Sequence, residues 1–172
     1  MTNDDKTIFI ETQKFSQWWI YAILGPVTAL FISFFIYQEL TGKLIGNHPM
    51  TNNQYIFTIA IICMVDSLFL MMRLQTRIDS DGIHVRFFPF RFNYGHYKWC
   101  EIGEVAIRNY DPISEYGGWG LRYSFKNGKA LTTSGNMGIQ IETKNGKKVL
   151  IGTQRSQEAE IAIRQLGTIL KK

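Results

Sequence analysis

The feature that most constrains this chain is a pair of long apolar segments in its N-terminal half. Residues 55–72 are eighteen residues with one ionisable group, Asp66. As a helix they would rise about 27 Å, close to the thickness of a bilayer's hydrocarbon core. Residues 18–37 contain no charge and carry Trp or Tyr at both ends. We therefore predict two membrane spans, 18–37 and 55–72, in a transmembrane helical hairpin over residues 18–74.

The alternative for residues 18–37 is a core helix of a soluble domain. Such a helix needs a surrounding domain large enough to cover it on all sides. Only 98 residues follow position 74, which is enough for one small hydrophobic core. The sequence therefore favours the membrane span.

The basic charge lies in the C-terminal part of the chain. Residues 1–74 hold four Lys or Arg against five Asp or Glu, whereas residues 75–172 hold fifteen against nine. Lys6 and Lys14 precede the first span, Lys43 alone lies between the spans, and Arg73 and Arg77 follow the second. Positive residues favour the cytoplasmic side. We therefore expect an integral membrane protein with both termini cytoplasmic and residues 1–17 as a cytoplasmic lead-in.

After the second span the apolar pattern changes to the period of two that is typical of strands. Hairpin signals such as Asn127-Gly128 and Asn145-Gly146 separate the strands. The expected strands are 76–79, 83–88, 94–99, 103–110, 120–125, 130–133, 138–143 and 147–152. Because their connections are too short for crossovers, we predict antiparallel pairing.

An amphipathic helix is predicted over residues 156–171, at the end of the chain. Its apolar stripe consists of Ala159, Ala162, Ile163, Leu166, Ile169 and Leu170. The predicted fold class is thus an α+β membrane protein: a two-helix transmembrane hairpin followed by a small antiparallel β-barrel, residues 75–172, with a C-terminal amphipathic helix.

Several segments of residues 18–170 resemble bacterial membrane proteins that have two spans and a cytoplasmic pleckstrin-homology-like (PH-like) domain. The most specific are residues 115–120, EYGGWG, and residues 134–138, SGNMG. The resemblance implies a PH-like barrel on a two-helix anchor in the bacterial cytoplasmic (inner) membrane. Because that family has no assigned reaction, it implies no catalytic residue.

The sequence gives no sign of a catalytic, metal or cofactor site. His48, His84 and His96 lie far apart, the two cysteines form no CxxC pair, and the common hydrolase, metalloprotease and phosphate-loop motifs are absent. Asp111, Glu115 and Glu101 are candidates for an acid and base pair, but solvated loop carboxylates explain them better. We expect a protein that is not an enzyme and has no cofactor.

Two non-enzymatic functions fit the sequence. The first is a scaffold or assembly protein whose domain binds a protein, either another protein or a second copy, with Tyr116 and Trp119 as the candidate interaction surface. The second is recognition of anionic lipid headgroups by the basic domain. We favour the scaffold because Arg77, Arg86 and Arg91 are spread along the sequence. Membrane lipid is an expected partner, and nucleic acid is not.

Two further expectations concern single positions. The run of four phenylalanines around Pro89 predicts an exposed tip at the membrane interface, with Phe88, Phe90 and Arg91; the alternative is that all four phenylalanines fill the core. Asp66 should face the other span, because a charge in a span is costly. There we expect a protonated Asp66 to donate to the backbone carbonyl of Ala22, which Pro26 deprives of its helical donor, or to a nearby carbonyl. The alternatives are that Asp66 contacts another protein or reaches toward Arg73.

Overall fold

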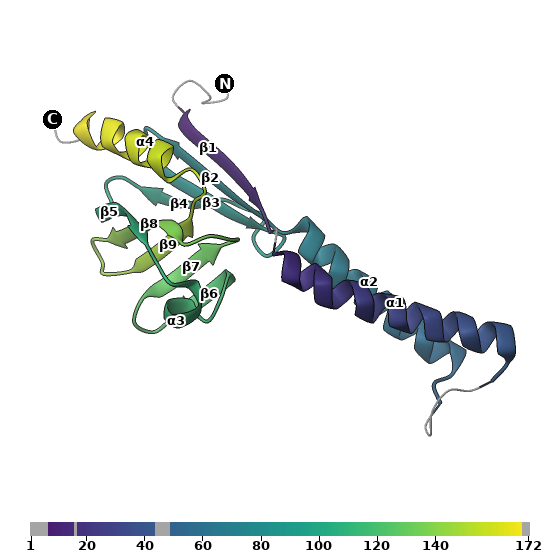
Figure 1. Ribbon diagram of the computed structural model, residues 1–172. Helices are drawn as coiled ribbons and strands as arrows, with labels where there is room; N and C mark the ends of the chain where they lie inside the picture. The colour runs from purple at the N-terminus through teal and green to yellow at the C-terminus, as the bar shows by residue number, and fades with distance from the viewer. Residues whose placement is uncertain (1–6, 16, 44–48, 170–172) are drawn as a thin grey trace. The chain divides into compact units, whose positions relative to one another are not determined.

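The computed structural model describes residues 7–15, 17–43 and 49–169, with side chains as far as residue 166. The chain divides into two compact units. One, the helical unit, is Gln17–Met71. The other, the β unit, is built from the residues before Gln17 together with those from Met72 onward (Figure 1). The helical unit is therefore an insertion between two neighbouring strands of the β unit.

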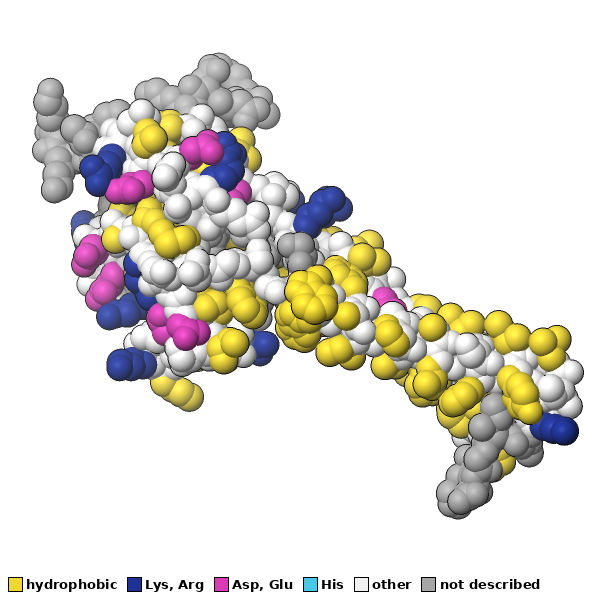
Figure 2. All heavy atoms as spheres, viewed as in Figure 1, with side chains coloured by type: hydrophobic (Ala, Val, Ile, Leu, Met, Phe, Trp, Pro, Cys, Tyr) yellow, Lys and Arg dark blue, Asp and Glu magenta, His cyan; other side chains and the backbone are white. Residues whose placement is uncertain are grey.

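The helical unit consists of α1 (Trp18–Thr41) and α2 (Asn52–Met71). Both predicted segments are helical, and both helices are long and apolar enough to cross a membrane. Only 6% of the most apolar part of each is buried, and many hydrophobic side chains lie along the visible surface of this unit (Figure 2). α1 ends at Gly42, whose left-handed backbone lets its N–H donate to the carbonyl of Gln38.

The first sheet of the β unit contains β1 (Thr7–Lys14), β2 (Arg73–Asp79), β3 (Gly82–Phe88) and β4 (Gly95–Lys98), antiparallel and in that order. The presence of β1 corrects the sequence analysis, which placed residues 1–17 outside the domain. β1 pairs with β2 along its whole length, from Thr7 opposite Asp79 to Lys14 opposite Arg73. The folded domain therefore begins before the first apolar helix.

The second sheet contains β5 (Ile102–Asn109), β6 (Gly120–Ser124), β7 (Gly128–Thr132), β8 (Met137–Thr143) and β9 (Lys148–Gly152), in the order β5-β8-β9-β7-β6. All eight strands predicted after the second apolar segment are present. Two features differ from the prediction. The β8–β9 hairpin folds back so that β9 lies parallel to β7, and no ladder joins the two sheets within the described residues, so they do not close into a barrel.

The C-terminal helix α4 (Ser156–Ile169) contacts β1 and β2 of the first sheet and β5 and β8 of the second. Ala159, Ala162, Ile163 and Leu166 of the predicted stripe are buried. The side chain of Ile169 and the whole of Leu170 lie outside the described part of the chain. The core between the sheets is made of aliphatic and aromatic side chains, including Leu74, Ile78, Ile83, Phe87, Leu131, Ile139, Ile141 and Ile151.

Two polar side chains of β1 point inward and join it to the second sheet. Gln13 donates to the carbonyl of Gly152 and accepts from the hydroxyl of Thr133, both at 2.7 Å. Glu11 accepts from the Thr153 hydroxyl at 2.7 Å and from the Gln154 N–H at 2.9 Å. Both side chains are almost fully buried. Because their hydrogen bonds are made inside the domain, these polar groups attach β1 rather than oppose its burial.

Candidate functional site

One end of the first sheet carries both covalent links to the helical unit, and we call it the linked end. Lys14 pairs with Arg73, and Arg73 pairs with Phe88. The N–H of Phe15 donates to the carbonyl of Met72 at 3.1 Å. Helix α2 ends at Met71. An extended chain spans at most about 3.6 Å per residue, so the links keep this end within a few residues of both helices.

The second sheet places β6 toward the linked end. β5 follows β4 after a short turn at the opposite end of the first sheet, whereas β7 and β9 end beside Gln13. Lys129, at the start of β7, lies near Arg91, which follows β3 in the sequence. Burial lowers the pKa of Lys129, and the charge of the nearby Arg91 lowers it further. Strand β6 lies beyond β7 as the outer strand on this side (Figure 1).

Strand β6 presents an exposed apolar edge. Leu121 is 43% exposed, Tyr123 72% and Phe125 fully exposed, and the last two rings meet edge to face with centroids 5.9 Å apart. In the described structure β6 pairs only with β7, so its outer side carries N–H and C=O groups that no strand pairs. We call strand β6 together with Leu121, Tyr123 and Phe125 the β6 edge.

The residues predicted as an interaction surface lie elsewhere. Tyr116 is buried, and its hydroxyl donates to the carbonyl of Asn127. Trp119 is half-buried, and its indole N–H donates to the carbonyl of Gly135 at 2.9 Å. The prediction is therefore wrong for Tyr116, which belongs to the core, and Trp119 braces the turn that leads into β6. The exposed aromatic residues are on β6 itself.

The phenylalanine run forms a turn at the linked end. Phe87 is buried, Phe88 is half-buried, Phe90 is 60% exposed and Phe92 71% exposed. The alternative in which all four rings fill the core is therefore wrong. The Arg91 side chain folds back, with Nη1 2.8 Å from the place that a Cβ on Gly95 would occupy. Phe90, Arg91 and Phe92 are all exposed in this turn, although the end of the Arg91 side chain reaches back toward Gly95.

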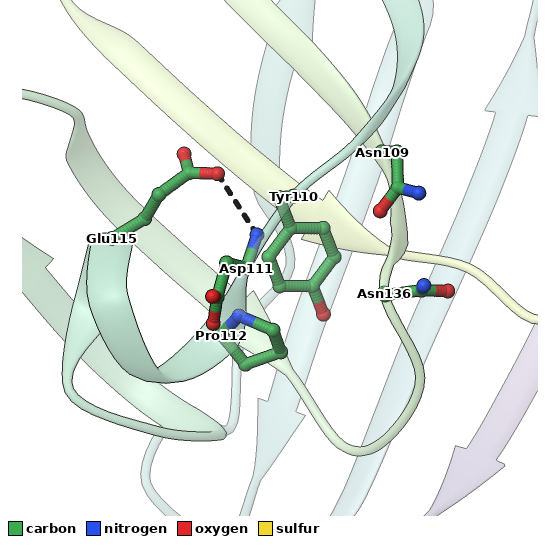
Figure 3. A pocket seen from close by; sticks show the side chains of 6 residues that line it. All are labelled: Asn109, Tyr110, Asp111, Pro112, Glu115 and Asn136. Atoms are coloured by element: carbon green, nitrogen blue, oxygen red, sulfur yellow. Dashed lines mark hydrogen bonds between the residues drawn. The ribbon is translucent and has the colours of Figure 1, made fainter.

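A shallow pocket of about 420 Å³ lies beside α3 (Pro112–Tyr116), a short helix that the sequence analysis did not predict (Figure 3). Asp111 caps α3 by accepting from the N–H groups of Ile113 and Ser114, which hold the pKa of its carboxyl low. Glu115 accepts two hydrogen bonds from Arg108, which lower its pKa. Burial raises the pKa of Tyr110 to about 12. These groups are engaged in the local fold and do not form an acid and base pair.

Asp66 faces α1, but its partner differs from the one predicted. The Thr28 hydroxyl lies 2.9 Å from Asp66 Oδ2 and 2.9 Å from the carbonyl of Leu24. Asp66 therefore contacts the side-chain hydroxyl of Thr28, one helical turn beyond Leu24, and not the backbone carbonyl of Ala22. At the other end of the hairpin, Gln38 donates to Asn52 and to the carbonyl of Met50. The Thr28–Asp66 and Gln38–Asn52 contacts thus join the two helices through polar side chains.

The fold brings together two histidines that are distant in the sequence. His84 of β3 and His96 of β4 are directly opposite each other, and their rings stack with centroids 4.1 Å apart. The carboxylate of Asp79 lies 3.1 Å from His84 Nε2, and that of Asp81 lies 3.2 Å from His96 Nε2. The third histidine, His48, is outside the described residues. Sequence reasoning missed this cluster because it depends on strand register.

Comparison with known proteins finds no matching family model, no matching curated protein and no matching solved structure. The resemblance to two-span proteins with a PH-like domain therefore stays a prediction. In the described part of the β unit, the β6 edge combines exposed apolar side chains with an outer side that no strand pairs.

Proposed function

We propose that this chain is a membrane-anchored, non-enzymatic scaffold that binds a protein partner through the β6 edge. In this proposal α1 and α2 span the bacterial cytoplasmic membrane, both termini are cytoplasmic, and the β unit is a PH-like domain at the cytoplasmic face. The partner contributes an extended segment that adds to the second sheet beside β6. The β6 edge is the observation that carries the proposal.

The exterior of the helical unit supports a membrane environment. As helices, 24 and 20 residues rise about 36 and 30 Å, enough to cross the hydrocarbon core. Their apolar side chains point outward, whereas Thr28 and Asp66 contact each other between the helices. Polar groups that meet inside a helix pair, with apolar groups outside, suit a lipid solvent.

The basic residues at the linked end support the orientation. Lys14 and Arg73 flank the two helices directly, and Arg77 follows on β2. Basic residues next to a span favour the cytoplasmic side. The β unit is formed from both flanks of the hairpin, so both flanks must lie on one side of the membrane. This requires an even number of spans, as two helices provide.

The β6 edge supports a protein partner because two kinds of recognition coincide there. The outer backbone groups of an edge strand can pair with an added strand, and the alternate side chains Leu121 and Tyr123 provide apolar contacts for it. Natural proteins usually protect such edges with charges, bulges or covering segments. Here Arg122 is the one charged side chain of the strand. No strand covers this apolar edge in the described structure, and a bound protein segment is the best explanation for it.

Headgroup recognition remains the second candidate, and one observation favours it. Phe90 and Phe92 are exposed at the linked end, where Lys14 and Arg73 also lie. Aromatic and basic side chains together suit the interface of a bilayer that contains anionic lipid. In this function the turn at residues 89–92 and the β6 edge would both rest on the membrane surface.

Photo-crosslinking in native membranes separates these functions. A photoreactive phenylalanine analogue replaces Tyr123 in the full-length chain, and the matched control carries it at Lys144, an exposed residue of the β8–β9 turn. The scaffold proposal predicts a discrete protein adduct from position 123 that is absent from position 144. An adduct twice the mass of the chain identifies a second copy as the partner. Adducts with lipid alone would favour headgroup recognition, and equal adducts at both positions would contradict the scaffold.

A further inference from the structure

The two histidines of the first sheet form a cluster that the scaffold function does not use. It lies at the end of the sheet opposite the linked end, where the β2–β3 turn meets β4. One ligand atom each from Asp81, His84 and His96 lies within 4.8 Å of the other two. We propose that these three side chains bind a divalent transition-metal ion of the Zn²⁺ class.

The distances fit a metal ion after small side-chain rotations. Zn²⁺ binds imidazole nitrogen at about 2.0–2.1 Å and carboxylate oxygen at about 2.0–2.2 Å, so two tetrahedral ligands lie about 3.4 Å apart. Asp81 Oδ2 and His96 Nε2 are already 3.2 Å apart. The remaining separations are at most 4.8 Å, and rotation of the His84 or Asp81 side chain closes them.

The histidine pair presents its nitrogens on one face of the sheet. Residues directly opposite on antiparallel strands have their side chains side by side, which places two imidazoles within reach of one ion. His96 Nε2 is covered and has no hydrogen-bond partner of good geometry among the described residues, although Asp81 is close. A buried polar atom without a partner is costly, and coordination of a metal ion would satisfy it.

The turn that carries Asp81 is held in place independently of any ion. Asp79 Oδ1 accepts from the N–H groups of Asp81 and Gly82 at 2.9 and 3.1 Å. The N–H of Trp99 donates to the carbonyl of Asp81, and its indole N–H donates to the carbonyl of Asp79. Because β4 and the turn are joined in this way, Asp81 is preorganised beside His96.

Gly82 makes the close approach of β4 possible. A Cβ at this position would lie 2.2 Å from the carbonyl oxygen of Tyr97 and 3.0 Å from His96 Nε2. Any larger residue would therefore push His96 away from the turn. The space beside His96 Nε2 is kept open by this glycine.

The charges around the cluster are compatible with a cation. Asp81 is exposed and its carboxylate lies beside His96, so its charge is available to an ion. Asp79 is shared between Arg77 and His84 and acts beside the site rather than in it. Two imidazoles and one carboxylate leave at least one coordination position for water or another ligand, as in three-ligand zinc sites.

Cobalt and zinc titration of the full-length chain in detergent tests this site. The protein carries a purification tag without histidine, and Cys63→Ser and Cys100→Ser remove the thiols. Co²⁺ is followed by its visible absorption, and Zn²⁺ by competition with a chromophoric chelator and by the melting temperature. The expected result is one saturable site per chain with micromolar affinity, and a melting temperature that rises with Zn²⁺.

Four variants decide the assignment: three at the proposed ligands and one control. His96→Gln and Asp81→Asn should each weaken binding by about tenfold or more and abolish the Zn²⁺-dependent rise in melting temperature. The matched control His48→Gln should leave both unchanged. The melting temperature of each variant without metal shows whether it is folded. Absence of a saturable Co²⁺ spectrum in the parent protein would overturn the site. Binding that survives both His84→Gln and His96→Gln, or that disappears with His48→Gln, would also overturn it.

Discussion

The two units of this molecule place their polar and apolar groups in opposite ways. In the β unit, most Ile, Leu and Val side chains are buried and most charged groups are outside. In the helical unit, most Ile, Leu and Phe side chains are exposed or half-buried, and Asp66 meets Thr28 between the helices. The first arrangement suits water and the second suits lipid. The difference supports the proposal of a membrane anchor that carries a water-facing domain.

The pairing of β1 with β2 shows how the two units are connected. The helical hairpin is inserted between β1 and β2, which are antiparallel neighbours hydrogen-bonded as far as Phe15 and Met72. The β unit should therefore fold without the helices if β1 is kept, and fail to fold if β1 is lost.

The largest effect is expected from the choice of fragment. A chain that joins Phe15 to Met72 through an Asn-Gly turn keeps both strands and should unfold cooperatively as a soluble domain. A fragment that begins at Met72 lacks β1 and with it the buried Phe9, Glu11 and Gln13. This fragment should show no cooperative unfolding transition, and it should thus lose a free energy of unfolding that is about 5 kcal/mol or more for such a domain. Urea unfolding followed by tryptophan fluorescence compares them, and equal midpoints would exclude β1 from the fold.

The next effect concerns the buried carboxylate of β1. Glu11→Ala in the joined domain leaves the Thr153 hydroxyl and the Gln154 N–H without their acceptor. Loss of hydrogen bonds to a charged group should lower the free energy of unfolding by about 2–3 kcal/mol. Thr12→Ala, at the exposed neighbouring position, should change it by about 0.5 kcal/mol or less. Equal shifts of the urea midpoint would show that Glu11 does not attach β1.

A smaller effect is expected in the helical unit. Asp66→Leu removes the contact with Thr28 and should destabilise the helix pair by about 0.6–1.7 kcal/mol, whereas Asp66→Asn, which keeps a polar side chain of the same shape, should change little. Detergent-induced unfolding of the full chain measures both. In the Thr28→Val background Asp66→Leu should cost less, because its partner is already absent. Equal costs in the two backgrounds would show that the contact contributes nothing.

The smallest effect concerns acid stability of the β unit. Hydrogen bonds from Arg108 hold the pKa of Glu115 below its ordinary value of 4.5. A depressed carboxyl pKa stabilises the fold above pH 4.5, and this contribution disappears as the pH falls through the lowered pKa. Because the ion pair is partly exposed, the contribution is about 1 kcal/mol or less. As the pH falls below 4.5, the melting temperature of the joined domain should decrease less steeply in Glu115→Gln than in the parent domain. Identical pH profiles of the two proteins would contradict this role of Glu115.

The sequence predicted elements whose signals are local. Two charge-free or nearly charge-free segments, turn pairs such as Asn127-Gly128, and the stripe from Ala159 to Leu166 were sufficient for α1, α2, the strands after Met72 and α4. β1 was missed because its inward positions are Phe9, Glu11 and Gln13, so the alternation of apolar residues is broken by two polar ones. The hydrogen-bond partners of Glu11 and Gln13 lie 120 to 143 residues away along the chain.

The candidate sites were harder to predict because they depend on register and burial. Tyr116 and Tyr123 are both tyrosines near glycines, but only the pairing of β6 with β7 leaves Tyr123 on an open edge. His84 and His96 come together because the β3–β4 register places them opposite each other across an irregular turn. No spacing rule in the sequence sets that register.

The central claim, a two-span anchor with its β unit at the cytoplasmic face, can be tested with the chain's own cysteines. Cys63 is exposed on the surface of α2, and Cys100 is exposed in the β unit. A membrane-impermeant maleimide is applied to sealed inverted and right-side-out vesicles and to protein denatured in detergent. We predict that Cys100 reacts in sealed inverted vesicles but not in sealed right-side-out vesicles. Cys63 should react in neither, because lipid covers it, and both cysteines should react after denaturation. Labelling of Cys63 in sealed vesicles at the rate of Cys100, or of Cys100 from the outer side, would contradict the claim.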